Sequence, residues 1–203
     1  LIGGVPGNFG ISARHLPSDR FVIEADEYDT AFFDKRSKFV HYQPKTAILN
    51  NLEFDHADIF TDLADIERQF HQLVRIVPRS GRLIVNGADT AITRVLGKGS
   101  WAPVERFGVA DGWDATEDAG DGSFMVCRDG EELGRVRWSL SGDHNRMNAL
   151  AAIAAGWHAG VEPATAIEAL AGFEGVRRRM EVRGSVRGIT VYDDFAHHPT
   201  AIA

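Results

Sequence analysis

Cysteine is nearly absent from this chain: Cys127 is the only one among 203 residues. A single cysteine excludes an internal disulfide, so the sequence fits a reducing compartment and predicts a cytoplasmic protein. Long apolar runs are missing too, because none approaches the roughly 20 residues of a membrane-spanning helix. No signal peptide is visible, and we therefore expect no membrane partner.

An excess of positive charge is also missing. The 22 lysine and arginine residues are outnumbered by 29 aspartate and glutamate residues, which gives a net charge of −7. This balance argues against a general nucleic-acid binder, so we expect no nucleic-acid partner. An anionic substrate is still compatible with it, because local arginine clusters and metal ions can hold one.

The phosphate-binding loop Gly-x-x-x-x-Gly-Lys-Ser/Thr is a third absence. An ATP enzyme built from this chain would need that loop upstream of Leu1. The chain starts without a methionine, on Leu1-Ile-Gly-Gly4, and stops at Ala203. These ends predict an excised piece of a longer protein, with one large domain or one domain plus part of another.

Two polar clusters stand out among the residues that are present. Glu24-Ala-Asp-Glu-Tyr-Asp29 follows the apolar run Phe21-Val-Ile23, and Asn50-Asn-Leu-Glu-Phe-Asp-His56 follows Thr46-Ala-Ile-Leu49. Short apolar runs between polar residues predict buried strands. Ligands of open α/β sheets bind beyond the carboxyl ends of such strands, so the two clusters predict a ligand site.

Glu24 and His56 are the candidate metal ligands. A carboxylate directly after a buried run is costly unless it is paired or binds a cation, and an imidazole beside Asp55, beyond a strand end, is a common ligand. Oxygen ligands with one imidazole suit Mg²⁺ or Mn²⁺, and no cysteine or close second histidine completes a zinc set. A solvated acidic loop is the plain alternative, and it stays open for the other acidic residues of the first cluster.

The rest of the chain alternates helix and strand signals, which predicts an α/β fold. Thr61 or Asp62 can cap a helix whose apolar side chains keep three-four spacing as far as Val77. From Val104 on, short strands and the turn signal Asp129-Gly130 predict an antiparallel patch added to the core. We also expect strands at 82–86, 104–108, 123–128, 133–140 and 188–194. Helices are expected at 89–96, where Asp89 can serve as the cap, and at 144–159 and 163–172.

His144, Asn145 and Asn148 lie at the start of the helix that Asp143 is expected to open. Amide side chains in this position can recognise the edge of a purine. Asp143 and Asn145 can equally serve as helix caps. The residue pattern alone leaves both interpretations open.

Basic residues gather near a domain boundary that we place at residues 175–181. Arg177-Arg-Arg179 is either a solvated turn or, at a domain junction, a source of positive charge for phosphates. His197-His198 follows Asp193-Asp194 and is either a metal pair or part of a loop in which Pro199 ends the strand. Neither alternative is excluded by the pattern.

Five motifs in order resemble the Mur ligase family, the ATP-dependent amide-forming enzymes of peptidoglycan synthesis. The resemblance implies the family's central ATP-binding domain at residues 1–176, a P-loop NTPase-like α/β fold with a mostly parallel sheet that here lacks its phosphate loop. It further implies the beginning of a Rossmann-like C-terminal ligase domain at residues 177–203. The motifs are Glu24-Ala-Asp-Glu27, Asn50-Asn-Leu-Glu-Phe-Asp-His56, His144-Asn-x-x-Asn-Ala-Leu-Ala-Ala152, Arg178-Arg-Met-Glu181 and Asp193-Asp-Phe-Ala-His-His-Pro199.

The resemblance also implies roles for single residues. Glu24 would bind the Mg²⁺ that bridges the ATP phosphates, His56 would hold a second Mg²⁺, and Arg179 would reach the phosphates. These three are the implied catalytic residues, and the first two are the metal ligands. The residues implied to lie near the nucleotide or its metals are Asn51, His144, Asn145, Asn148, Arg179, Asp194 and His197.

One departure from the family concerns the second metal. Several relatives carry a carbamylated lysine after the residue that matches His56. This chain has no lysine between Lys45 and Lys98, and it has His71 in that region. The departure fits the branches that add alanine or recycle peptides.

Within the family, Gly3–Gly10 and Glu27–Phe39 resemble the branch that recycles murein peptides. The implied reaction is the ATP-dependent joining of the tripeptide L-Ala-γ-D-Glu-meso-diaminopimelate to UDP-N-acetylmuramate through an acyl phosphate, with Mg²⁺ neutralising charge. One alternative is the branch that adds L-alanine to the same donor. A second alternative is a folded module without activity, and we expect this fragment alone not to turn over.

Overall fold

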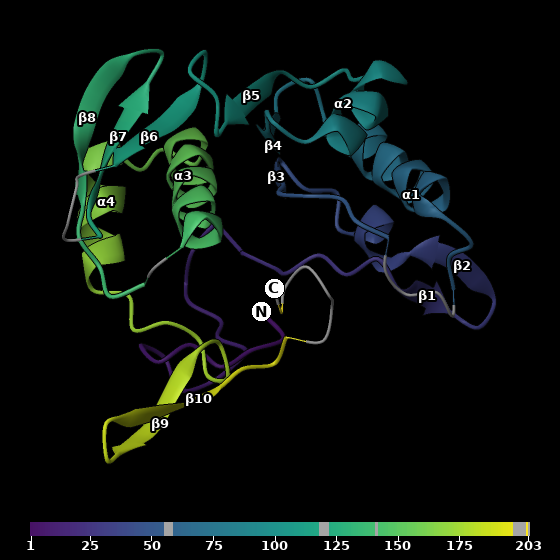
Figure 1. The fold of residues 1–203 in the computed structure, drawn as a ribbon. Helices are drawn as coiled ribbons and strands as arrows, with labels where there is room; N and C mark the ends of the chain where they lie inside the picture. Colours follow the sequence, from purple (N-terminus) through teal and green to yellow (C-terminus); the bar gives the residue numbers. More distant parts are fainter. Residues whose placement is uncertain (55–58, 118–121, 141, 197–201, 203) are drawn as a thin grey trace. The chain divides into compact units, whose positions relative to one another are not determined.

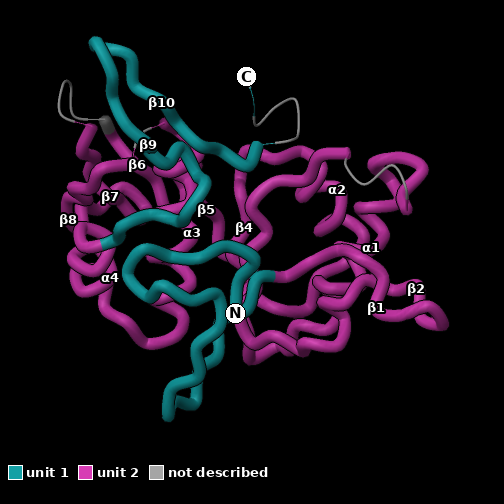
Figure 2. Tube along the Cα trace, turned by 90° about the horizontal axis from the view of Figure 1, so that it is seen from below, with its two compact units in different colours: residues 1–24, 173–203 teal, residues 25–172 magenta. Residues whose placement is uncertain are grey.

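A computed structural model describes residues 1–54, 59–117, 122–140, 142–196 and 202 of the chain. The chain forms two compact units, which Figure 2 shows in different colours. The large unit comprises residues 25–172, and the small unit comprises residues 1–24 together with 173–203. These units describe contacts within this chain, and the division into domains at 1–176 and 177–203 stays a prediction.

A mixed sheet of six strands forms the centre of the large unit (Figure 1). Its order is β3-β4-β5-β6-β7-β8, with parallel pairing from β3 to β6 and antiparallel pairing from β6 to β8. The predicted mostly parallel sheet with an antiparallel patch is therefore confirmed. The strands are β3 (Thr46–Leu49), β4 (Arg82–Asn86), β5 (Val104–Phe107), β6 (Trp113–Glu117), β7 (Phe124–Arg128) and β8 (Glu131–Val136).

Helices cover both faces of this sheet. Successive β4 side chains point to opposite faces, so Leu83 and Val85 join a core with Val74 and Ile92, whereas Ile84 joins a second core. The first core lies under α1 and α2, and the second lies under α3 and α4 (Figure 1). The helices are α1 (Leu63–Ile76), α2 (Thr90–Gly97), α3 (Asp143–His158) and α4 (Pro163–Ala171).

The starts of α1 and α2 follow the predicted local chemistry. The Asp62 side chain accepts a hydrogen bond from the backbone N–H of Asp65 at 2.9 Å, and Asp89 accepts one from Ile92 at 2.9 Å. Both caps are confirmed, because a carboxylate at this position satisfies an N–H that lacks a partner within the helix. α3 differs, since it begins after Gly142 without a side-chain cap.

One expected strand is absent, and four strands and a short 3-10 helix were not expected. Phe21-Val-Ile23 forms no strand, and the side chains of Phe21 and Val22 are 59% and 79% exposed. The prediction of a buried strand there is wrong. The run has no sheet neighbour, and its backbone instead bonds to the first residues of the chain, with the Leu1 amine donating to the Val22 carbonyl at 2.8 Å. The elements not anticipated are β6, β9 (Glu181–Val186) and the hairpin of β1 (Asp29–Ala31) with β2 (Asp34–Ser37), after which comes the short 3-10 helix η1 (Lys38–His41).

The small unit contains one antiparallel hairpin. β9 pairs with β10 (Ile189–Asp193), and the expected strand at 188–194 is thus confirmed. Pro6 bridges to Val176, which joins the N-terminal and C-terminal segments of this unit. In the described part of the chain, no helix has the length and apolar character needed to cross a membrane.

Candidate functional site

The carboxyl end of β3 is tied to two helices by side-chain hydrogen bonds. Asn50, which directly follows β3, donates from Nδ2 to Oδ1 of Asn148 in α3 at 2.8 Å. Two residues further on, the Leu52 N–H donates to Oδ2 of Asp89, the cap of α2, at 3.0 Å. This strand end therefore meets the starts of α2 and α3, where open α/β sheets place their ligands.

The ends of β4 and β5 approach the same helix closely. Gly87 N–H donates to the Phe107 carbonyl at 2.8 Å. Gly108 follows with φ of +71°, and a Cβ built there would lie 2.2 Å from Cε of Met147 in α3. The left-handed backbone favours glycine here, and a Cβ would also displace the flexible end of the Met147 side chain. The carboxyl edge of the parallel strands and the first turns of α3 therefore form one surface.

The three candidate residues of α3 all lie in its first two turns. His144 is exposed beside Gly142, where an added Cβ would be 2.9 Å from the imidazole Cε1. Asn145 is half-buried, and its N–H donates to the Gly142 carbonyl at 3.1 Å. Asp143 pairs with Arg146 at 2.7 Å. Gly142 occupies the cap position of the helix, so Asp143 is not its cap residue, and a capping role of Asn145 stays open. Recognition of a purine stays a prediction.

Of the two predicted metal ligands, the structure describes Glu24 but not His56. Glu24 lies in the small unit and is exposed, and its Oε2 accepts a hydrogen bond from the Gly3 N–H at 2.6 Å. This donor is a neutral backbone group, so the bond brings no positive charge to the carboxylate. The argument that burial makes Glu24 costly is lost, because the run before it is exposed. His56 lies outside the described residues.

No ready metal cluster is seen among the described residues, since no three histidine, cysteine, aspartate or glutamate side chains gather there as a ligand set. Asn51, the neighbour of the predicted second metal, is exposed after β3. His71 lies in α1, where its Nε2 is 3.2 Å from the Gly99 carbonyl. That contact links α1 to the turn after α2. The metal roles of Glu24 and His56 stay predictions.

Arg179 and Asp194 come together in the small unit. The guanidinium of Arg179 lies 5.8 Å from the centroid of the Phe195 ring, and that of Arg178 lies 4.8 Å from it. Asp194 accepts hydrogen bonds from two backbone N–H groups, those of Met180 at 2.7 Å and Ala196 at 2.6 Å. The basic turn is thus held against the loop after β10, and His197 lies beyond the described residues.

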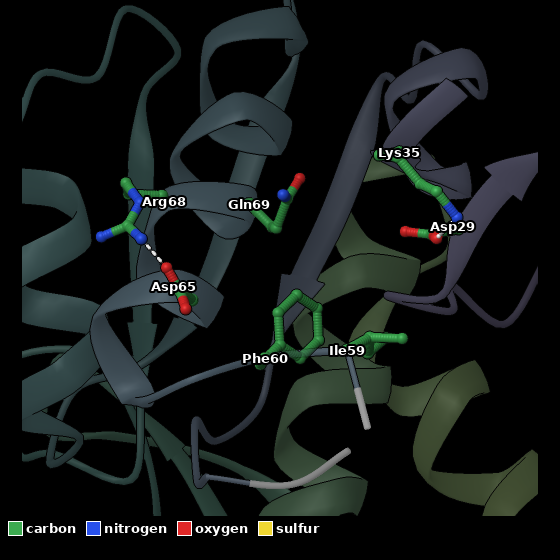
Figure 3. Close-up of a pocket in the computed structure, with 7 residues that line it drawn as sticks. All are labelled: Asp29, Lys35, Ile59, Phe60, Asp65, Arg68 and Gln69. Atoms are coloured by element: carbon green, nitrogen blue, oxygen red, sulfur yellow. Dashed lines mark hydrogen bonds and ion pairs between the residues drawn. The ribbon is translucent and has the colours of Figure 1, made fainter. Parts of the chain in front are cut away.

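A cavity that the sequence did not suggest lies between α1 and the β1–β2 hairpin, with a volume of about 470 Å³. Figure 3 shows Asp65, Arg68 and Gln69 on one side, and Asp29 and Lys35 on the other. Lys35 pairs with Asp29 at 2.7 Å, and Arg68 pairs with Asp65. Charged residues scattered over the hairpin and helix gave no sequence signal, because only tertiary folding brings them to one cavity.

The same hairpin contains a carboxyl group, that of Asp34, whose pKa is strongly lowered. Arg36 donates to both oxygens of Asp34, at 2.9 and 2.7 Å. These hydrogen bonds to the guanidinium are the main reason that the pKa of Asp34 is held well below its usual range. His41 adds a further contact to Asp34 at 3.2 Å. The network fixes the strand β2 to the start of the segment that leads to β3.

Comparison with known proteins identifies close relatives. The chain is 59% identical over all of its 203 residues to UDP-N-acetylmuramate--L-alanyl-gamma-D-glutamyl-meso-2,6-diaminoheptandioate ligase of Escherichia coli, of which it covers 44%. It is 34% identical over 190 residues to UDP-N-acetylmuramate--L-alanine ligase of Clostridium acetobutylicum, covering 91% of this chain and 40% of that protein. The chain therefore spans less than half the length of these relatives.

A solved structure supports the same grouping. The crystal structure of UDP-N-acetylmuramate:L-alanyl-gamma-D-glutamyl-meso-diaminopimelate ligase from Neisseria meningitides matches with a TM-score of 0.80 and 59% identity, over 87% of this chain and 57% of that one. The Mur ligase middle domain matches residues 12–156. The fold expected from the sequence is confirmed, and the chain belongs to the Mur ligase family.

Proposed function

We propose that the whole protein is an ATP-dependent ligase that joins L-Ala-γ-D-Glu-meso-diaminopimelate to UDP-N-acetylmuramate. One observation carries the choice of acceptor. The chain is 59% identical to a relative named for the tripeptide, but only 34% identical to the relative named for L-alanine. The two reactions share a donor, so the difference in identity bears on the acceptor.

The proposed chemistry needs charge neutralisation and positioning more than covalent catalysis. ATP supplies the phosphoryl group that activates the lactoyl carboxylate, and Mg²⁺ neutralises the phosphates. The amine of the tripeptide then attacks the acyl phosphate, and phosphate leaves. In this proposal the carboxylate of Glu24 binds the cation, and the guanidinium of Arg179, which lies 5.8 Å from the centroid of the Phe195 ring, offers positive charge to a phosphate.

The first turns of α3 fit the base of the nucleotide. Asn145 and Asn148 supply amide groups there, and Asn148 is exposed at the carboxyl edge of the sheet. In the small unit, Asp194 holds the loop that follows β10. We propose Asp194 and His197 as the nucleotide-binding residues of this unit. Recycling of peptides and a cytoplasmic location complete the proposal.

Phosphate release by the full-length protein tests this function. With UDP-N-acetylmuramate and Mg-ATP, we expect release with the tripeptide and very little with L-alanine at equal concentration. The reverse preference would support the alanine-adding alternative, and no release with either would support an inactive module. Omitting the donor is the control, because release without it reports only ATP hydrolysis.

The metal requirement is tested in the same assay. We expect activity with Mg²⁺ or Mn²⁺ and unchanged activity with a zinc-selective chelator, because carboxylate and phosphate oxygens suit hard cations. Full activity in magnesium-free buffer containing zinc would contradict the proposed metal.

A further inference from the structure

β3 and α3 are joined by two side-chain hydrogen bonds, one near each end of the strand. Near the amino end, Thr46 Oγ1 lies 2.7 Å from Nδ1 of His158. Beyond the carboxyl end, Asn50 Nδ2 lies 2.8 Å from Oδ1 of Asn148. The two pairs link the same strand to the same helix, but only the second lies at the carboxyl edge of the sheet.

In the second pair, the amide of Asn148 is held by its carbonyl oxygen. A primary amide has a carbonyl oxygen on one side and an NH₂ group on the other. Because Asn50 donates to Oδ1 of Asn148, the carbonyl of Asn148 faces the strand. Its NH₂ group is thereby turned away from Asn50. Without a donor at position 50, the amide of Asn148 could rotate by half a turn at little cost.

We propose that Asn50 is a positioning residue for nucleotide binding, which turns the NH₂ group of Asn148 toward a ring nitrogen of the purine base. Ring nitrogens are acceptors, so they require a donor. This inference rests on the proposed function, in which the base lies at the first turns of α3. It adds a residue that makes no contact with the nucleotide itself.

The hydrogen bond between Asn50 and Asn148 is better explained by the orientation that it gives to the Asn148 amide than by a gain in the stability of the fold. Asn148 is exposed and the bond between the two amides is open to solvent, and a neutral hydrogen bond contributes only about 0.5–1.5 kcal/mol even on average. The Thr46–His158 pair already fastens α3 to β3. Rotational freedom of Asn148 would, in contrast, weaken any contact that needs its NH₂ group on one side.

Calorimetric titration of the full-length protein with Mg-ADP tests the proposal without relying on ligation. We expect Asn148→Ala to weaken ADP binding about five- to tenfold and Asn50→Ala about two- to fivefold, as for loss or loosening of one hydrogen bond. Asn50→Asp should weaken binding more than Asn50→Ala. Its carboxylate accepts but cannot donate, so it attracts the NH₂ group of Asn148 and reverses the amide.

The double variant separates positioning from a general structural effect. If Asn50 acts through Asn148, then Asn50→Ala should cost no further affinity in the Asn148→Ala background. Thr46→Ala is the matched control, because it breaks the other link between β3 and α3. We expect it to lower the melting temperature at least as much as Asn50→Ala does, because its bond is partly buried, and to leave ADP affinity unchanged.

The inference would be overturned if Asn50→Ala lowered ADP affinity equally in the native protein and in the Asn148→Ala variant. A loss of ADP affinity in Thr46→Ala, or native ADP affinity in Asn50→Asp, would also overturn it. A native protein that binds no Mg-ADP would overturn it too. A native protein that binds Mg-ADP but releases no phosphate with the tripeptide would contradict the proposed function alone. The two proposals therefore fail by different measurements.

Discussion

Arg94 Nε donates to Oε1 of Glu67 at 2.8 Å, and this bond joins α2 to α1. Lys98 reaches the other oxygen of the same carboxylate at 3.3 Å. Glu67 is only 6% exposed, whereas its two partners extend to the surface. A buried carboxylate with two cationic partners fastens the helix pair that covers one face of the sheet.

Replacement of Glu67 is therefore expected to destabilise the fold. Glu67→Ala removes a buried acceptor and leaves a small cavity, with an expected cost of about 1–3 kcal/mol in the free energy of unfolding. Arg94→Ala should cost less, because Lys98 still pairs with the carboxylate. Urea denaturation of both variants measures the difference, and a larger loss in Arg94→Ala would contradict this ranking.

Glu24→Gln tests the proposed metal ligand. The change keeps the shape and the acceptor for the Gly3 N–H, but it removes the negative charge. We expect kcat of the full-length ligase to fall on the order of 100-fold or more, as for loss of an electrostatic group, with an unchanged melting temperature. Turnover close to the native value would show that Glu24 serves only the backbone of the small unit.

Gly108→Ala is expected to disturb the contact between β5 and α3. The added Cβ meets the flexible end of Met147, and φ of +71° strains any residue other than glycine. We expect a cost of about 1–2 kcal/mol in unfolding free energy. Gly97→Ala is the control, since a Cβ there has open space in α2 and should be neutral or slightly stabilising. Equal effects of the two substitutions would argue against the tight approach of α3.

The thiol of Cys127 should react slowly in the folded protein. Burial, followed by the charges of Glu132 and Asp114, raises its pKa above the ordinary value of 9.0. At neutral pH it is a protonated thiol, which is a poor nucleophile. We expect iodoacetamide labelling at pH 7.5 to be much slower in buffer than in urea. Equally fast labelling in both would contradict the raised pKa.

The same shift has a consequence for stability at alkaline pH. The Cys127 thiol keeps its proton to higher pH in the folded state than in the unfolded state. Its contribution to the free energy of unfolding is therefore full below pH 9 and is lost as the pH rises through the raised pKa. A Cys127→Ala variant should therefore lose less stability than the native protein between pH 8 and the alkaline limit of the assay. Parallel curves for both proteins would count against this linkage.

Local chemistry could be predicted from the sequence where a few neighbouring residues decide the structure. The caps Asp62 and Asp89 each bond to an N–H three residues ahead. Asp129 and Gly130 both have positive φ, as the predicted two-residue hairpin requires. These features depend on little beyond the segment itself, so they are recovered without the rest of the fold.

Features that depend on distant partners were missed. Phe21-Val-Ile23 has the composition of a buried strand, but a strand needs a neighbour, and this run has none in the described structure. β6 was overlooked because Trp113-Asp-Ala-Thr-Glu117 has no apolar run. Asn50 and Asn148 are 98 residues apart, so their pairing becomes visible only in three dimensions.

The turn between β7 and β8 offers a place to attach a reporter group. Asp129 and Gly130 are exposed, and β7 runs antiparallel to β6, with Arg128 opposite Trp113 at the start of that strand. The turn joins β7 and β8, the last two strands of the sheet order, whereas Asn50 follows β3 at the other end of that order. A fluorophore on a cysteine introduced at position 129, with Cys127 replaced, would label the large unit several strands away from β3, beside which the nucleotide is proposed to bind.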